Sequence, residues 1–154
     1  MTFLQILTPS AIKVLSGTSS KKRLLHDVAE LAHVAYGLDS GRTVEALLER
    51  ENLGPTGVGR GIALPHARLE GLTSVVGAFI LLEKPVAFES VDQQPVDLVF
   101  ALLAPQEAGV EHLKALALVS RTLRDPGMCR KLRANPNSAM LHTILTETHS
   151  VAAA

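Results

Sequence analysis

Two nearly unbroken apolar runs, at residues 74–82 and 96–103, constrain the fold of this chain more than any other feature. Both are rich in branched and aromatic side chains and are bounded by proline and charge, as strands buried on both faces usually are. Neither approaches the roughly 20 apolar residues that a membrane-spanning helix needs. They therefore predict the centre of a β-sheet in a globular protein, with no direct insertion into a membrane.

Segments with helical spacing lie on both sides of these runs. Apolar residues recur at helical intervals from Ser20 and stop at Gly37, a common C-terminal stop signal. Further helices are predicted at 43–50, behind the cap candidates Asp39 and Ser40, and at 110–123, 128–133 and 138–148. A short strand is predicted at 62–64, closed by Pro65. In the 110–123 helix, the expected core face consists of Leu113, Leu116, Ala117, Ser120 and Leu123.

Chain length and composition suit one domain. With 154 residues, 47% of them apolar, the chain can bury one sizeable core, and no repeat or linker divides it. We predict a single α/β domain over residues 1–154, with a mixed β-sheet flanked by helices on both faces. The core should span about 5–149, and 150–154 should form a frayed tail.

Charge and cysteine content narrow the class of partner and the compartment. Lys+Arg and Asp+Glu are equal at 15 each, so the chain has no basic excess with which to hold a nucleic acid. A protein or a small anion is the expected partner. The single cysteine, Cys129, cannot form an intramolecular disulfide, and residues 1–8 have neither the basic start nor the cleavage site of a signal peptide. We therefore expect a cytoplasmic protein.

Histidine is the side chain whose neutral, nucleophilic form is well populated at neutral pH, and the chain has 6. Four of them are expected to be solvated, because they lie on the polar face of the first long helix or near the end of the chain: His26, His33, His142 and His149. Two candidates for chemistry are left, His66 and His112.

His66 follows Pro65 directly, after a short apolar strand and a glycine-rich turn. A side chain at such a place can be held rigidly and still be exposed. The glycines at 54, 57, 59 and 61 would let backbone N–H groups converge on an anion. The turn is neither a dinucleotide fingerprint, since it follows a helix and precedes a strand, nor a P-loop, since it lacks Gly-Lys-Ser/Thr. The alternative is purely structural, with His66 capping a strand and the glycines forming a tight turn.

His112 falls in the first turn of the 110–123 helix, where the helix dipole favours anions and keeps a nearby imidazole neutral. It could assist a transferred phosphoryl group, or it could be a surface residue beside Glu111. Arg50 and Arg60 bracket the glycine turn and could pair with phosphate oxygens, although arginines on a surface are commonly just solvated.

A longer pattern in the same region resembles a known family. Arg50-Glu51 followed by Gly54-x-Thr56-Gly57-Val58-Gly59-x-Gly61-Ile62-Ala63-Leu64-Pro65-His66 is similar to the active-site signature of the fructose/mannitol-type enzyme IIA proteins. Segments 85–88 and 94–103 and the pair His112-Leu113 continue the likeness in the same order, so that it covers about 20–133. The helix start at 20–23 and the lack of a fused transporter segment look most like the nitrogen-regulatory branch of that family.

The resemblance implies a phosphotransferase that needs no cofactor and no metal. His66 would take a phosphoryl group from the phosphohistidine of an HPr-like carrier, with phosphoenolpyruvate as the ultimate donor. His112 and Arg50 would assist the phosphoryl group and Thr56 would lie beside it, while Gly57 and Gly59 would supply the glycine cradle. Further partners would be regulatory target proteins or a IIB domain.

Three positions depart from the family pattern: Pro55 replaces a usual Ser, Arg60 an uncharged residue and Ala67 a usual Gly. Pro55 and Ala67 bear on the conformation of the loop, and Arg60 is expected to add a positive charge near the site. None of these departures replaces the nucleophile.

Three other functions are compatible with parts of this pattern. The chain could be a sugar-transport subunit of the same family, or an interaction module that has lost phosphorylation. It could also be a metal-dependent hydrolase using His66 and His112 with Glu111 or Asp97, although it lacks the HExxH spacing.

Overall fold

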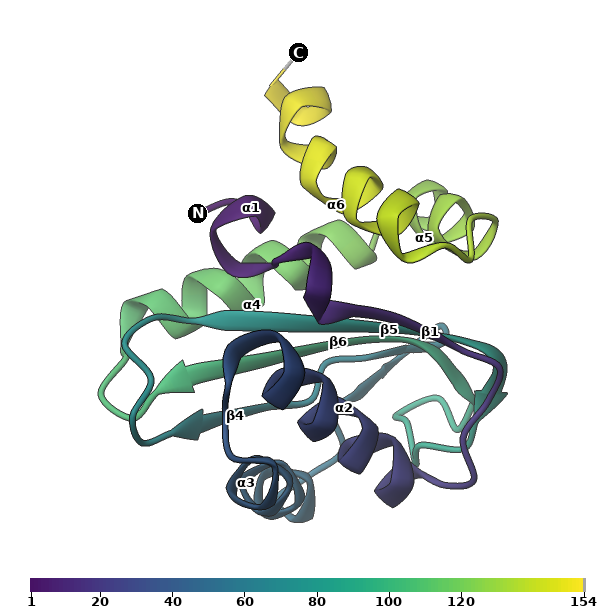
Figure 1. The fold of residues 1–154 in the computed structure, drawn as a ribbon. Coiled ribbons are helices and arrows are strands. Elements are labelled where there is room, and N and C mark those ends of the chain that lie inside the picture. The colour runs from purple at the N-terminus through teal and green to yellow at the C-terminus, as the bar shows by residue number, and fades with distance from the viewer. Residues whose placement is uncertain (154) are drawn as a thin grey trace.

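A mixed sheet lies between two layers of helices in the computed structural model, which describes residues 1–153 and the side chains of residues 1–147 (Figure 1). One face is covered by α2 (Lys21–Tyr36) and α3 (Ser40–Asn52). On the other face lie α1 (Phe3–Ile6), α4 (Val110–Leu123), α5 (Pro126–Arg133) and α6 (Ser138–Ala153). This arrangement confirms the expected α/β fold. The frayed tail predicted at 150–154 consists of residues whose side chains lie outside the described part of the chain.

The sheet is built around the two apolar runs. They form β5 (Val76–Val86) and β6 (Val96–Pro105), which pair antiparallel at its centre. β1 (Ile12–Leu15), reached through a short 3₁₀ turn at Pro9–Ala11, pairs parallel with the outer edge of β5. The other edge of β6 carries β3 (Ile62–Ala63) and β4 (His66–Leu69), and β2 (Gly57–Gly59) pairs antiparallel with β3. Parallel and antiparallel pairs together make the sheet mixed, as predicted.

β3 and β4 are two parts of one extended segment that runs parallel to β6. Ile62 lies opposite Leu98 and His66 lies opposite Leu102, so the register is the same on both sides of the break. The ladder is interrupted at Pro65, which has no N–H to donate. Its carbonyl still accepts a hydrogen bond from the Leu102 N–H at 3.0 Å. The short strand predicted at 62–64 is thus confirmed as β3, which ends before Pro65, and His66 begins a further strand that was not predicted.

Local capping explains where the helices that carry the site begin and end. The Ser20 hydroxyl accepts a hydrogen bond from the Arg23 N–H at the start of α2, and Gly37 ends that helix with a φ of 73°. Asp39 caps α3 by accepting from the Arg42 N–H at 2.8 Å. These ends agree with the predicted caps, because capping depends on residues close in sequence. No helix within the described residues is long and apolar enough to cross a membrane.

α4 has the predicted bounds, but its buried face differs from the predicted one. Leu113 is 64% exposed. The face against the sheet consists instead of His112, Ala115, Val119, Thr122 and Leu123. Packing against β6 sets the rotation of this helix and brings a histidine into its buried side.

Candidate functional site

An open groove of about 680 Å³ lies where the end of α3, the strand β4 and the start of α4 meet. Arg50 enters it from the last turn of α3, His66 and Arg68 from β4, and His112 from the first turn of α4. The remaining lining residues are Ala46, Glu49, Asn52, Leu53 and Ala67. The groove thus collects two imidazoles and two guanidinium groups from three elements.

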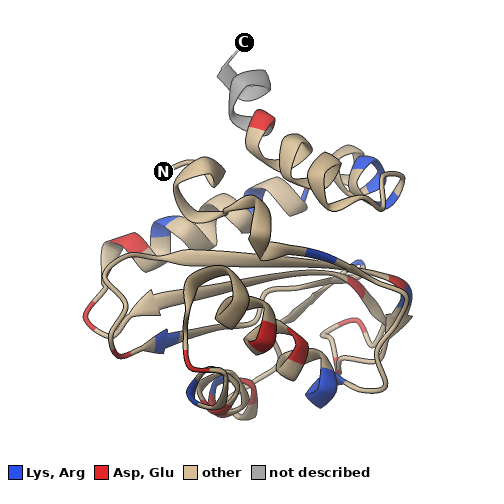
Figure 2. Ribbon diagram, in the orientation of Figure 1, with Lys and Arg blue, Asp and Glu red and all other residues tan. Residues whose placement is uncertain are grey.

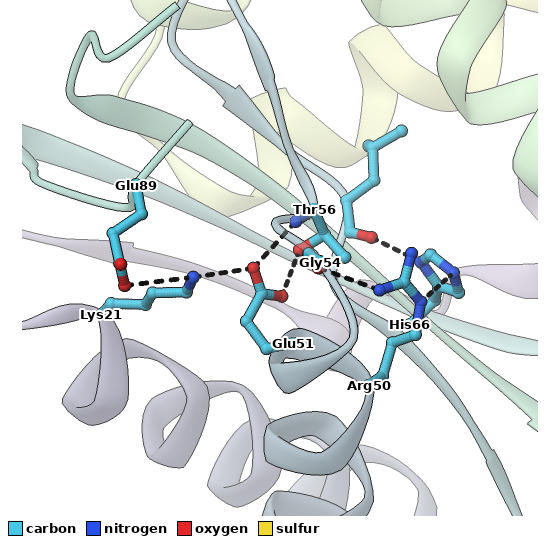
Figure 3. Close-up of polar contacts among 8 residues, drawn as sticks. Lys21, Arg50, Glu51, Gly54, Thr56, His66 and Glu89 are labelled. Carbon is cyan, nitrogen blue, oxygen red and sulfur yellow. Dashed lines mark hydrogen bonds and ion pairs between the residues drawn. The ribbon is translucent and has the colours of Figure 1, made fainter. Parts of the chain in front are cut away.

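The tautomer of His66 is set by the backbone (Figure 3). Nδ1 lies 2.8 Å from the Leu64 carbonyl oxygen, and because a carbonyl only accepts, Nδ1 carries the proton. Nε2 is therefore the nitrogen with a lone pair. Arg50 Nε donates to it at 3.3 Å. Nε2 thus carries the lone pair of the ring, and it faces a cation.

The surroundings of His66 keep the imidazole neutral. Burial, the largest effect, lowers the pKa of His66, and the charge of Arg50 lowers it further. The Leu64 carbonyl and the Glu51 carboxylate oppose these effects without reversing them. At neutral pH the ring therefore has the uncharged form in which a lone pair is free to attack.

His112 lies next to His66, with 5.6 Å between the ring centroids. Its side chain is buried, which contradicts the alternative of a surface residue. Burial lowers the pKa of His112, and the nearby His66 and Arg68 lower it further. Nδ1 is buried and has no hydrogen-bond partner among the described residues. Because a buried N–H without an acceptor is costly, the proton is better placed on Nε2.

Each arginine of the groove is anchored to the backbone. Arg50 Nη1 donates to the Gly54 carbonyl at 2.9 Å while its Nε contacts His66. Arg68 Nη1 donates to the carbonyls of Gln106 and Ala108, just before α4. Arg68 did not emerge from the sequence reasoning. The alternation of a strand, which places residues two apart on one face, would have identified it once β4 was recognised.

A polar network centred on Glu51 lies behind the groove (Figure 3). Its carboxylate accepts from the Thr56 N–H at 2.8 Å and from the Thr56 hydroxyl at 2.6 Å, and it pairs with Lys21 Nζ at 2.9 Å. The carboxylate side chain is only 5% exposed. The segment that this network fixes contacts both residues that hold the His66 ring. The Gly54 carbonyl accepts from Arg50, and the Thr56 carbonyl accepts from the Leu64 N–H at 2.9 Å. Sequence reasoning assigned Glu51 no role.

Thr56, Gly57 and Gly59 do not line the groove, although the sequence placed them beside the phosphoryl group. Both donors of Thr56 are engaged by Glu51. Gly57 and Gly59 form the strand β2 rather than a turn. A Cβ at Gly57 would collide with the Ser90 hydroxyl, so this glycine permits close packing against the loop before β6.

Three further residues named from the sequence also lie elsewhere. Arg60 is at the turn between β2 and β3 and lines a different pocket, so the expectation that it adds charge to the site is wrong. Asp97 pairs with Arg133 at 2.8 Å, and Glu111 lies 3.7 Å from Lys114. Among the described residues, no group of three His, Cys, Asp or Glu side chains is placed to hold a metal ion.

Two of the other histidines take part in local contacts away from the groove. Nδ1 of His33 lies 2.9 Å from the Leu38 carbonyl, just beyond the end of α2. His142 Nε2 lies 3.0 Å from the Leu7 carbonyl and ties α6 to the N-terminal segment, so it is half-buried rather than solvated. The side chain of His149 lies outside the described residues.

This geometry suits the uptake of an anionic electrophile. A neutral imidazole presents one lone pair, and Arg50 and Arg68 flank it with positive charge. An Nε2–H on His112 would add a neutral donor. Phosphoryl transfer asks a protein mainly for such positioning and charge stabilisation.

Comparison with known proteins gives consistent results. The family model for the phosphoenolpyruvate-dependent sugar phosphotransferase system, EIIA 2, matches residues 5–148. A nitrogen regulatory protein from Bradyrhizobium diazoefficiens is 42% identical over 153 residues, 99% of this chain and 100% of that protein. One from Klebsiella oxytoca is 48% identical over 132 residues, 85% of this chain and 82% of that protein. The crystal structure of the nitrogen regulatory protein IIA-Ntr from Neisseria meningitidis superposes with a TM-score of 0.84 at 36% identity, covering 92% of this chain and 97% of that one.

Proposed function

Because the chain belongs to the EIIA 2 family of the phosphoenolpyruvate-dependent sugar phosphotransferase system, we propose that it is a nitrogen-regulatory phosphoryl carrier that accepts its phosphoryl group on Nε2 of His66. The observation that carries the assignment is the hydrogen bond between His66 Nδ1 and the Leu64 carbonyl. It holds the proton on one ring nitrogen and leaves the other unprotonated, beside Arg50 in an open groove.

Transfer begins when the phosphohistidine of an HPr-like carrier enters the groove. The lone pair of His66 Nε2 attacks phosphorus, and the new N–P bond forms as the N–P bond to the donor imidazole breaks. The proton on Nδ1 stays in its hydrogen bond to Leu64 throughout. Arg50 Nε, which contacts the lone pair before transfer, then donates to a phosphoryl oxygen instead.

Charge stabilisation falls to the other groups of the groove. Arg68 adds a second guanidinium, and His112, neutral and at a helix N-terminus, can donate one hydrogen bond to the phosphoryl group. The Glu51 network keeps Arg50 and Leu64 in place. Thr56, Gly57 and Gly59 act indirectly in this proposal, by shaping the segment that leads to His66.

The regulatory output follows from charge. A phosphoryl group brings roughly two negative charges, and the chain has a formal net charge of zero. Leu53, which lines the groove, is 84% exposed, and Leu113 beside His112 is 64% exposed. A target protein that docks on these apolar side chains and brings no cation of its own would lose affinity on phosphorylation, because it would have to cover a charged phosphoryl group that was absent before.

The acceptor assignment is tested by intact mass after incubation with phosphoenolpyruvate, enzyme I and an HPr-type carrier. The chain should gain one phosphoryl group that is labile in acid and stable in alkali, and His66→Ala should gain none. His26→Ala, which changes a histidine outside the groove, is the matched control and should be phosphorylated normally. Uptake of one phosphoryl group by His66→Ala would show that another residue is the acceptor.

The regulatory role is tested separately. Phosphorylated and unphosphorylated protein are compared in pull-downs from cell extract, and a deletion strain is grown on fructose and on mannitol. We expect partners that depend on the phosphorylation state and growth on both sugars. Partners indifferent to phosphorylation, together with lost growth on one sugar, would favour a transport subunit.

A further inference from the structure

Arg60 has a backbone conformation that residues other than glycine rarely adopt. Its φ is 56°, in the left-handed region. Two hydrogen bonds with distant segments hold the backbone of Arg60 in this conformation. Its N–H donates to Asp92 Oδ2 at 2.9 Å, and its carbonyl accepts from Arg133 Nη2 at 3.0 Å. A strained residue that is fixed from both sides often serves a local function.

The side chain of Arg60 borders a pocket of about 150 Å³ at the corner between α4 and α5. Three more arginines line this pocket, and its apolar lining comes from Ile62, Leu123, Pro126 and Cys129. The pocket is separate from the His66 groove. Ile62 and His66 lie four residues apart along β6, a separation of roughly 13 Å at the rise of a strand.

The charges at this corner are not balanced. Arg133 forms two hydrogen bonds with the Asp97 carboxylate, at 2.8 and 2.9 Å. By contrast, the guanidinium groups of Arg60, Arg124 and Arg130 make no hydrogen bond or ion pair with any residue that the structure describes. Figure 2 shows basic residues gathered on α5. This corner of a chain with no net charge therefore carries three guanidinium groups without an ion pair to a described residue, beside the carboxylates of Asp97 and Asp125.

The positive charge reaches the interior of the pocket. Burial raises the pKa of the Cys129 thiol; the nearby Arg133 and Arg60 act against that rise, and Asp97 and Asp125 add to it. Arg60 and Arg133 therefore act at the buried thiol, while Arg124 and Arg130 line the exposed rim of the pocket. A small anion in the pocket would meet these cations at short range.

We propose that this pocket binds a phosphate group, either as free phosphate or as the phosphomonoester of a small molecule. Guanidinium groups match the geometry of phosphate oxygens and bind them through paired N–H donors. At about 150 Å³ the pocket has room for one such group, since sites for drug-sized ligands are roughly 300–1,000 Å³. No aromatic side chain lines it, so it lacks the stacking surface of a nucleic-acid site.

The test is a titration of the full chain with inorganic phosphate and, separately, with glycerol phosphate, at an ionic strength held constant with sodium chloride. Backbone amide NMR shifts report which residues respond. We expect saturable shifts of the amides at 60–62 and 124–133 with at least one of the two probes. The probe with the lower Kd identifies whether the site takes free phosphate or a phosphomonoester. Arg60→Asn and Arg130→Gln should each raise the Kd by about tenfold, as expected for the loss of one charge-assisted hydrogen bond. Asparagine tolerates the left-handed backbone of Arg60.

Two controls separate this site from its surroundings. Arg121→Gln removes an exposed arginine of α4 outside the pocket and should leave the Kd unchanged. Arg50→Gln weakens the His66 groove and should not alter the shifts at 124–133. The proposal is overturned if the shifts are confined to the His66 groove, or if Arg60→Asn and Arg130→Gln both keep the original Kd. It is also overturned if an acidic peptide or an oligonucleotide shifts these amides and neither phosphate probe does.

Discussion

Replacing Glu51 with alanine would remove the centre of the network behind the groove. The carboxylate accepts from the Thr56 N–H at 2.8 Å and from the Thr56 hydroxyl at 2.6 Å, and it pairs with the Lys21 ammonium at 2.9 Å. All three groups would lose this acceptor. Thr56 is 4% exposed, so water cannot easily replace that acceptor. Lys21 would keep a second contact, 3.6 Å from Glu89, and its side chain is 17% exposed.

The size of the effect follows from these contacts. A hydrogen bond to a charged group contributes about 1.5–3 kcal/mol, and breaking one partner of a buried ion pair costs about 3–5 kcal/mol. Because Lys21 retains Glu89 and some water, we expect Glu51→Ala to lower the free energy of unfolding by about 3 kcal/mol. For a chain of this size, that corresponds to a fall in Tm of about 6–12 °C.

Urea unfolding followed by circular dichroism measures this loss. Glu51→Gln keeps the shape and can still bond both groups of Thr56, so it should lose only about 1 kcal/mol. Glu45→Ala, an exposed change on the same helix, should stay within about 0.5 kcal/mol of the original. A double-mutant cycle with Thr56→Val should give a coupling energy of about 1 kcal/mol or more. A loss below about 1 kcal/mol for Glu51→Ala would refute the reasoning, because the network would then be dispensable.

Three further predictions concern the groove. Arg50→Gln should slow phosphoryl uptake by about a hundredfold or more and, by removing a cation beside the ring, should raise the pKa of His66, which NMR titration measures. His112→Ala should still accept the phosphoryl group but should slow forward and reverse transfer by about a hundredfold; unchanged rates in quenched-flow assays would remove His112 from the site. The pKa values of both imidazoles are lowered. The rate of phosphoryl uptake should therefore stay constant as the pH falls through about 6.5, the ordinary pKa of histidine. It should decline only at a lower pH, where the rings of the folded protein become protonated. Since the unfolded chain protonates these rings more readily, the free energy of unfolding should decrease as the pH drops below about 6.5. Urea unfolding at pH 7.5 and 5.5 checks this, and a smaller decrease is expected for His66→Gln.

Sequence reasoning succeeded where the signal is local. Ser20, Gly37 and Asp39 mark helix ends through contacts with residues a few positions away, and the structure shows those caps. The runs at 74–82 and 96–103 needed only composition to be recognised as central strands. His66 and His112 were selected by their positions relative to a strand and a helix start, and the structure brings them together.

The failures depend on contacts between distant segments. β1 was missed because its pairing partner, β5, lies more than sixty residues away. Gly57 and Gly59 were interpreted as a cradle because nothing nearby in sequence indicates that the loop around Ser90 packs on them. The buried face of α4 was misplaced because packing on β6, rather than the pattern of leucines, sets its rotation. Glu51 gained a role only once Thr56 and Lys21 came within reach of it.

The unbroken register from Ile62 to His66 along β6 limits how this protein can change over time. A strand alternates its faces with every residue, so one inserted or deleted residue between those two positions would turn the imidazole to the opposite side of the sheet. Such a change would bury the His66 imidazole or remove it from Arg50, even if every side chain of the groove were kept. The turn at Arg60 precedes Ile62 and is free of this constraint. Length variation among descendants of this chain should therefore be absent from the residues between Ile62 and His66.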